Sequence, residues 1–164
     1  MLVISDTNIL IDIEVGGIIS LFFQLPHDFC VPDILFSEEL EEKHQHLCDM
    51  GLQVKELTSN SMIEAQSLIE RYSTSKRAPS RMDCFALMLA LQEKTRLLTG
   101  DRRLNRAAKK EGVEVNGIIW VVDLMIEENL LSLDGARVAY EKMEADGSRL
   151  PWKEIYRGLR EREI

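Results

Sequence analysis

The sequence has no hydrophobic run long enough to cross a membrane. Its longest apolar stretch, residues 17–25, contains Gln24 and is about half the roughly 18 to 20 residues that a transmembrane helix requires. The first residues also lack the basic, apolar and small-residue segments of a secretion signal. These absences argue against the integral membrane class, and we expect a cytoplasmic protein.

Cysteine is scarce as well. The chain has three cysteines, Cys30, Cys48 and Cys84, an odd number without any C-x-x-C spacing. A disulfide framework needs pairs, and a thiolate zinc site needs closely spaced ligands. The sequence therefore predicts neither, and the three thiols are expected to be buried or partly buried.

Histidine occurs only three times. His44 and His46 lie two positions apart, near Glu41 and Glu42, and all four are residue types that bind metal ions. On a helix, however, residues two positions apart do not face each other. We therefore expect no metal site at this pair of histidines.

Positive charge is in deficit overall but not everywhere. The 164 residues include 20 lysines and arginines against 28 acids, a net charge of −8, which ordinarily argues against a nucleic-acid partner. Residues 71–110, however, hold eleven basic residues against Asp83, Glu93 and Asp101, a local charge of +8. Such a local field can attract a polyanion even when the whole molecule is acidic.

Short apolar strands alternate with helical segments along most of the chain. Strands are expected at residues 1–4, 29–31, 52–57, 96–99 and 113–115. This alternation predicts an α/β protein, a three-layer α/β/α sandwich with a mainly parallel sheet of four or five strands. Everything from Gly117 onwards is expected to be helical.

Two of the expected helices differ in their apolar patterns. The helix over residues 62–72 has one apolar face, so Ile63, Leu68 and Ile69 are expected to be buried. The helix over residues 80–91 is apolar on every side of its body. A helix of that kind is typical of the centre of a domain.

Four acids lie where predicted elements begin or end. Asp6 and Asp101 each follow a strand, Glu39 falls in a helix predicted over residues 33–43, and Asp83 opens the apolar helix. In parallel sheets the carboxyl ends of the strands form the edge at which ligands bind. Converging carboxylates repel unless a cation neutralises them, and their hard oxygens suit Mg²⁺ or Mn²⁺. A pair of such ions activates water for phosphodiester hydrolysis.

Each acid also has a purely structural interpretation. Asp6 and Asp101 stand where a residue caps a helix or forms a turn, and Ser80-x-x-Asp83 has capping-box spacing. Glu39 belongs to an acidic run that is typical of a solvated helix face. The functional interpretation therefore depends on the four acids being considered together.

Four motifs in a fixed order resemble those of PIN-domain ribonucleases, a family that includes the toxins of VapBC toxin–antitoxin pairs. They are Asp6-Thr7-Asn8-Ile9-Leu10-Ile11-Asp12, Val31-Pro32-Asp33 leading to Glu39-Leu40, Ser80-Arg81-Met82-Asp83, and Leu98-Thr99-Gly100-Asp101-Arg102-Arg103-Leu104. The resemblance spans Met1 to about Val115. It implies a PIN-like nuclease domain over residues 1–116 and a helical extension, residues 117–164, packed on the same domain.

The resemblance also implies the site residues and the reaction. The catalytic and metal-binding residues would be Asp6, Glu39, Asp83 and Asp101, holding Mg²⁺ or Mn²⁺ for the hydrolysis of RNA. Glu38 is the alternative to Glu39, which is preferred because Leu40 follows it. The expected substrate-binding residues are Asn8, Arg81, Thr99, Arg102 and Arg103.

Partners are implied in the same way. The resemblance predicts an RNA substrate, an antitoxin protein as a candidate partner, and a homodimer. The helical extension is longer than a minimal toxin needs, and its start, Gly117-Ile118-Ile119-Trp120, is similar to that of uncharacterised bacterial and archaeal PIN proteins. The alternative function is a non-catalytic PIN-like module that binds protein or RNA.

Overall fold

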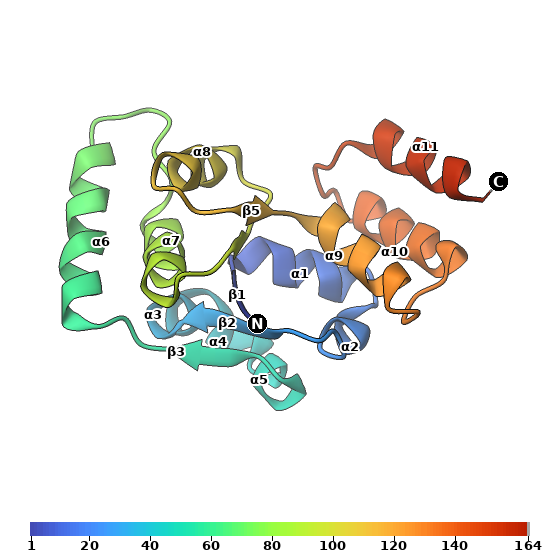
Figure 1. The fold of residues 1–164 in the computed structure, drawn as a ribbon, viewed down its shortest axis with the longest axis horizontal. Helices are drawn as coiled ribbons and strands as arrows, with labels where there is room; N and C mark the ends of the chain where they lie inside the picture. The colour runs from blue at the N-terminus through green and yellow to red at the C-terminus, as the bar shows by residue number, and fades with distance from the viewer. Residues whose placement is uncertain (164) are drawn as a thin grey trace.

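Five parallel strands form one sheet at the centre of the molecule (Figure 1). The structure is a computed structural model and describes residues 1–163. The strands are β1 (Leu2–Ser5), β2 (Asp28–Pro32), β3 (Gln53–Lys55), β4 (Leu97–Leu98) and β5 (Val115–Asn116). The predicted parallel sheet of four or five strands is thereby confirmed.

The strand order β3-β2-β1-β4-β5 places β1 in the middle of the sheet. Ile4 pairs with Cys30 of β2 on one side and with Leu97 of β4 on the other. The chain thus runs outwards from β1 to β3 and returns to add β4 on the opposite side. A parallel sheet opens into a ligand-binding crevice where its strand order reverses in this way. Here that point lies between the carboxyl ends of β1 and β4.

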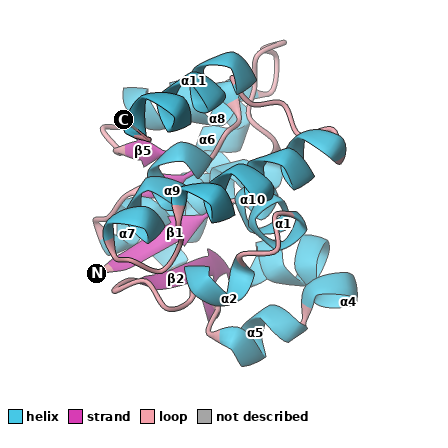
Figure 2. Cartoon of the chain, turned by 90° about the vertical axis from the view of Figure 1, so that its right-hand side faces the viewer, coloured by secondary structure: helices cyan, strands magenta, loops and turns pink. Residues whose placement is uncertain are grey.

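Helices cover both faces of the sheet, which completes the predicted three layers. Figure 1 shows one layer to the left of β1 and the other to its right, and Figure 2 looks onto the latter with the strands behind it. The left layer contains α6 (Ser59–Tyr72), α7 (Arg81–Glu93) and α8 (Arg102–Lys110), and the right layer contains α1 (Thr7–Val15), α9 (Ile118–Glu127), α10 (Leu133–Ala145) and α11 (Trp152–Arg162). The short α2 (Ile19–Phe22) follows α1.

Helix α7 is the central helix of its layer, as its all-round apolar sequence predicted. Every residue from Cys84 to Ala90 is buried, and the helix packs against β1, β2, β4, α6 and α8. Burial on all sides accounts for the absence of a polar face. The amino terminus of α7, which carries Asp83, is thereby held in a fixed position.

The prediction for α6 was partly wrong. Leu68 is fully buried and Ile69 partly so, but the side chain of Ile63 is 67 % exposed. Helix α6 lies at the outer edge of the molecule and packs mainly on α7. It therefore needs only a narrow apolar stripe, which Ala65 and Leu68 supply.

The segment after β2 is also more broken than the single helix predicted for residues 33–43. It consists of α3 (Asp33–Leu35), the π-helical turn η1 (Phe36–Leu40), α4 (Glu41–His44) and, after Gln45, α5 (His46–Met50). Leu40, at φ −117°, departs from ordinary helical geometry. Glu39 therefore lies in the wider turn of a π-helix, a feature found frequently at functional sites.

The helices after β5 agree with the predicted helical extension. Helix α10 packs on α1 and on α11, and α9 contacts both α1 and α10. Ile164, the last residue of the predicted extension, lies outside the described residues. None of the helices within residues 1–163 combines the length and apolar character needed to span a bilayer.

Candidate metal site at the carboxyl edge of the sheet

Asp6 is a buried carboxylate at the end of the central strand. Its side chain is 2 % exposed, and its Oδ1 caps α1 by accepting a hydrogen bond of 2.9 Å from the backbone N–H of Ile9. Its Oδ2 accepts a hydrogen bond from the hydroxyl of Thr99, which follows β4. The structural role foreseen for Asp6, helix capping, uses one oxygen and leaves the other for contacts across the crevice.

Asp101 is tied to Asp6 through the same threonine. The backbone N–H of Asp101 donates to Thr99 Oγ1 at 3.0 Å, and Asp101 Oδ1 caps α8 at the N–H of Leu104, at 2.9 Å. A single hydroxyl group thus joins the residues that follow β1 and β4. Thr99 is 3 % exposed, so its hydroxyl orients the two acids from inside the protein.

Asp83 caps the central helix α7. With Ser80 it forms a capping box, in which Asp83 N–H donates to Ser80 Oγ at 3.1 Å and Ser80 N–H donates to Asp83 Oδ2 at 3.2 Å. Asp6, Asp83 and Asp101 thus each place a carboxylate at the amino terminus of a helix.

The three aspartates act on one another electrostatically. The pKa of Asp6 is raised to about 7, chiefly by burial and in part by the charges of Asp83 and Asp101, while the hydrogen bonds from Thr99 and Ile9 to its carboxylate oppose the rise. Burial also raises the pKa of Asp83, and the charge of Asp101 adds to this effect. Like charges that disfavour each other's ionisation are relieved by a bound cation.

Glu39 reaches the same region from the π-helical turn η1. Partial burial raises the pKa of its carboxyl group, and the charges of Asp83 and Glu38 contribute. The charge of Asp83 contributes to the raised pKa of Glu39, so the two carboxylates interact electrostatically. Glu39 stays the predicted fourth acid, with Glu38 as the alternative. We call the set Asp6, Glu39, Asp83 and Asp101 the acidic edge.

The donor atoms of the acidic edge fit a hard divalent cation. The hydroxyl of buried Thr7 lies close enough to Glu39 to lower the pKa of its carboxyl group, but it makes no hydrogen bond of good geometry among the described residues. No three carboxylates of the acidic edge lie within 4.8 Å of one another in residues 1–163. A cation at the acidic edge would therefore take one or two of these carboxylates directly and complete its coordination with water, as Mg²⁺ does.

A groove continues from the acidic edge along the helical extension. Its first part, about 320 Å³, is lined by Asn8, Asp101, Ser148 and Arg149 among others. Its second part, about 520 Å³, shares Arg149 and is also lined by Arg102. The hydroxyl of Ser148 donates to Asp12 of α1 at 2.6 Å, which anchors this loop beside the acids.

Sequence reasoning missed Ser148 and Arg149. No strand end, cap spacing or basic run marks the loop between α10 and α11, and only the packing of the extension on α1 brings it to the site. Asn8 and Arg102, which were predicted, line the groove. Arg103 instead lines a separate basic hollow with Arg77, Arg106 and Lys110. The guanidinium of exposed Arg81 lies over the Phe85 ring, 5.3 Å from its centroid.

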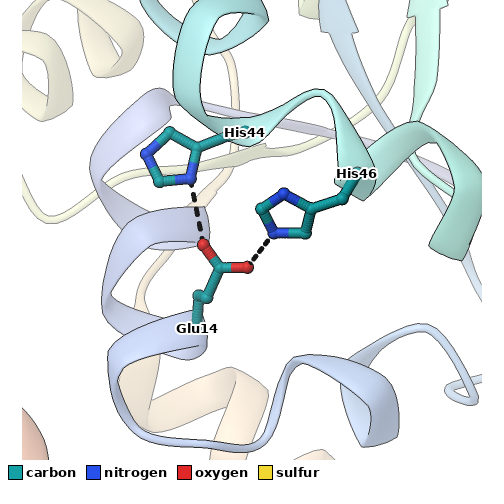
Figure 3. Close-up of side chains that lie close together, drawn as sticks. All are labelled: Glu14, His44 and His46. Carbon is teal, nitrogen blue, oxygen red and sulfur yellow. Dashed lines mark hydrogen bonds and ion pairs between the residues drawn. The ribbon is translucent and has the colours of Figure 1, made fainter.

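The premise that His44 and His46 cannot face the same point, because they lie two positions apart, was wrong. Both rings point to the carboxylate of Glu14 (Figure 3), and the ligand atoms of these residues all lie within 4.8 Å of one another. Helical hydrogen bonding breaks at Gln45, between α4 and α5, so the rule for an unbroken helix does not apply. We call Glu14, His44 and His46 the histidine cluster.

The fold is that of a three-layer α/β protein in which Asp6 and Asp101, joined through Thr99, follow the two strands at the switch point of the sheet. The sequence matches the family model DUF3368, described as a PIN domain, over residues 2–163. The chain therefore belongs to this PIN-domain family, as its four motifs indicated.

One solved structure supports the same fold. The chain is similar to a protein in the crystal structure of VapBC2 from Rickettsia felis bound to a DNA fragment from their promoter, with 12 % identity, a TM-score of 0.51, and 71 % of this chain and 98 % of that one covered. It is also similar to a PilT N-terminus domain protein from Sulfolobus solfataricus P2, with 14 % identity, a TM-score of 0.49, and 75 % and 92 % covered. A search of curated proteins finds no match.

Proposed function

We propose that this protein is an Mg²⁺- or Mn²⁺-dependent endoribonuclease and that the acidic edge is its active site. The observation that carries the proposal is the hydroxyl of Thr99, which joins Asp6 and Asp101 at the switch point while Asp83 and Glu39 approach from two other elements. Membership of a PIN-domain family supports it, because PIN domains are commonly ribonucleases.

The residues of the acidic edge have separate tasks in this proposal. Asp6 and Asp101 hold the cation most rigidly, since both are fixed by a helix cap and by Thr99. Asp83 and Glu39 complete the negative field, directly or through water. When bound, the cation supplies the Lewis acid that activates a water molecule and neutralises charge on the phosphate.

The basic residues position the RNA. Arg102 and Arg149 line the groove that leaves the acidic edge, and exposed arginines contact phosphate oxygens well because their planar fork matches them. The excess of positive charge in residues 71–110 attracts RNA to a protein of net charge −8. Arg81 and Arg103 extend this basic surface on the side of α7 and α8.

An antitoxin partner and a homodimer are further parts of the proposal. The similar VapBC2 structure holds a complex bound to promoter DNA, and this motivates a search for a protein partner of the present chain. Analytical ultracentrifugation of the purified protein gives its oligomeric state. Affinity capture with the wild-type chain tests for a bound antitoxin.

Cleavage of mixed RNAs in Mg²⁺ or Mn²⁺ tests the proposal, with wild type beside Asp101→Asn. Asp28→Asn is the matched control, because Asp28 is an exposed aspartate at the amino end of β2, the opposite edge of the sheet. We expect wild type and the control to cleave RNA, EDTA to stop both, and Asp101→Asn to be inactive. Cleavage that persists in EDTA contradicts the metal mechanism, and a wild type that captures a partner but cleaves nothing favours the binding module.

A further inference from the structure

The histidine cluster brings together two imidazoles and a carboxylate from three different helices. Glu14 lies near the end of α1, His44 is the last residue of α4, and His46 is the first of α5. His44 Nδ1 lies 2.9 Å from Glu14 Oε1, and His46 Nε2 contacts Glu14 Oε2 (Figure 3). Each oxygen of the carboxylate therefore faces one ring nitrogen.

Two features let residues two positions apart reach one carboxylate. The regular hydrogen bonding of the helix is interrupted at Gln45, and the two histidines use different nitrogens. His44 uses Nδ1, which lies close to its backbone, whereas His46 uses the more distant Nε2. The ring centroids are 6.0 Å apart and the planes are inclined by 45°, so the rings converge on the carboxylate without stacking on each other.

We propose that Glu14, His44 and His46 form a second metal site, which binds a divalent transition-metal ion such as Zn²⁺. Two histidines and a glutamate are a ligand set of known zinc sites that keep an open position for water. Imidazole nitrogen also favours Zn²⁺, Co²⁺ and Ni²⁺ over Mg²⁺. The histidine cluster and the acidic edge thus differ in the class of ion that they select.

The ligand atoms need only small shifts to hold the ion, because the direct contacts of the two imidazoles with Glu14 would open slightly as the ion enters between them. The ligand atoms lie within 4.8 Å of one another, and ligands of a tetrahedral zinc ion lie about 3.3 Å apart, given metal–ligand distances of about 2.0–2.1 Å. The side chain of His46 is 49 % exposed and that of Glu14 is 27 % exposed. The side chains therefore have room to adjust, and water can fill the remaining coordination position.

Binding at the histidine cluster has a structural consequence for the acidic edge. Helix α1 begins at its cap Asp6 and ends beside Glu14, while Glu39 precedes α4, which ends at His44. An ion at the cluster joins the far ends of the two segments that carry Asp6 and Glu39. The ion therefore holds the second segment against α1, and it stabilises the folded state by an amount that grows with the logarithm of its affinity.

Titration of the tag-free, metal-free full-length protein with Co²⁺ and Zn²⁺ at pH 7.5 tests the proposal. We expect one Co²⁺ to give visible d–d absorption, and Zn²⁺ to displace it. Glu14→Gln, His44→Gln and His46→Gln should each weaken binding at least tenfold, because each removes one of three ligands. His27→Gln is the matched control, since His27 is the one histidine outside the cluster, and it should bind as wild type does.

A second readout keeps the test independent of folding and of RNA cleavage. Zn²⁺ should raise the melting temperature of wild type, His27→Gln and Asp6→Asn, and should leave that of His46→Gln unchanged. His46 is the most exposed member of the cluster, so its variant is expected to fold. Co²⁺ binding that survives all three cluster variants, or that disappears in Asp6→Asn, overturns the proposal. Neither result depends on whether the acidic edge cleaves RNA.

Discussion

The acidic edge and the histidine cluster differ in how the chain holds their ligand atoms. The aspartates of the acidic edge are fixed by backbone caps at the starts of α1, α7 and α8, and Asp6 is almost completely buried. The members of the histidine cluster are held only by one another and are partly exposed. The comparison teaches that the same fold offers a rigid oxygen site at its sheet edge and an adaptable nitrogen-containing site at a helix break.

The largest expected effect is the loss of cleavage when the acidic edge is changed. Asp6→Asn should lower the rate of RNA cleavage at least about 100-fold, because it removes the most rigidly held charge of the site. Asparagine still caps a helix, so the fold should persist. Single-turnover cleavage rates measure the effect, and an Asp6→Asn variant as fast as wild type would contradict the assignment.

Substitutions of Glu39 and Glu38 form a matched pair of variants that tests which of the two residues is the fourth acid. Glu39→Gln should slow cleavage about tenfold or more, because its carboxylate interacts electrostatically with Asp83. Glu38→Gln should cleave as wild type does, although it removes the same charge from the neighbouring residue. The reverse order of the two rates would assign the fourth position to Glu38.

The two hydrogen bonds of the Thr99 hydroxyl, to Asp6 and to Asp101, should affect both activity and stability. Thr99→Val keeps the shape of the side chain but removes the hydroxyl that bonds Asp6 and Asp101. We expect a loss of about 1–3 kcal/mol in the free energy of unfolding and a fall in cleavage of about 10–100-fold. Thr99→Ser should retain most of the stability and most of the cleavage rate. A serine variant as defective as the valine variant would show that the packing of this side chain matters and its hydroxyl does not.

The raised pKa of Asp6 predicts how stability changes with pH. Between the ordinary value of 3.8 and the folded value of about 7, the folded state holds a proton that the unfolded state releases. The contribution of Asp6 to the free energy of unfolding therefore decreases as pH rises through this range and is lowest above about pH 7. Asp6→Asn should reduce this decrease and raise metal-free stability at pH 8 by on the order of 1–3 kcal/mol.

Urea unfolding of wild type and Asp6→Asn at pH 5 and pH 8 measures this effect. Mg²⁺ should stabilise the wild type more at pH 8 than at pH 5, because the cation binds the ionised acids. The same Mg²⁺ should not stabilise Asp6→Asn. A wild type whose stability rises from pH 5 to pH 8 by more than that of the variant would refute the raised pKa.

The smallest expected effect is that of a single groove arginine. Arg149→Ala should weaken RNA binding severalfold and reduce the dependence of log affinity on log salt concentration by about 1. Arg157→Ala, on the exposed side of α11, is the control, since Arg157 does not line the groove. Equal effects of the two substitutions would mean that RNA affinity depends only on the total charge of the extension.

Much of the fold and of the acidic edge is readable from local sequence. Asp6 directly follows an apolar strand, and Asp101 closely follows another. The rule that ligands bind at the carboxyl ends of parallel strands can be applied without knowledge of tertiary contacts. The apolar body of α7 likewise predicts that this helix lies at the centre of its layer. The division at residue 116, the cytoplasmic location and the roles of the site residues stay predictions.

Other features depend on contacts that local patterns do not encode. The π-helical turn that carries Glu39 and the break at Gln45 lie within a segment whose sequence is typical of one continuous helix. The position of Arg149 depends on the docking of α10 on α1. Ile63 is exposed because α6 lies at the outer edge of the molecule and packs mainly on α7, so its exposure depends on the neighbours of the helix and not on its own sequence.

Binding of Mn²⁺, followed by electron paramagnetic resonance in metal-free protein, tests the central claim most directly. We predict that wild type and Glu14→Gln bind Mn²⁺ with the same affinity, whereas Asp6→Asn and Asp101→Asn bind it at least tenfold more weakly. This result would assign the hard cation to the acidic edge and separate it from the histidine cluster. Mn²⁺ binding that is unchanged in both aspartate variants would contradict the account.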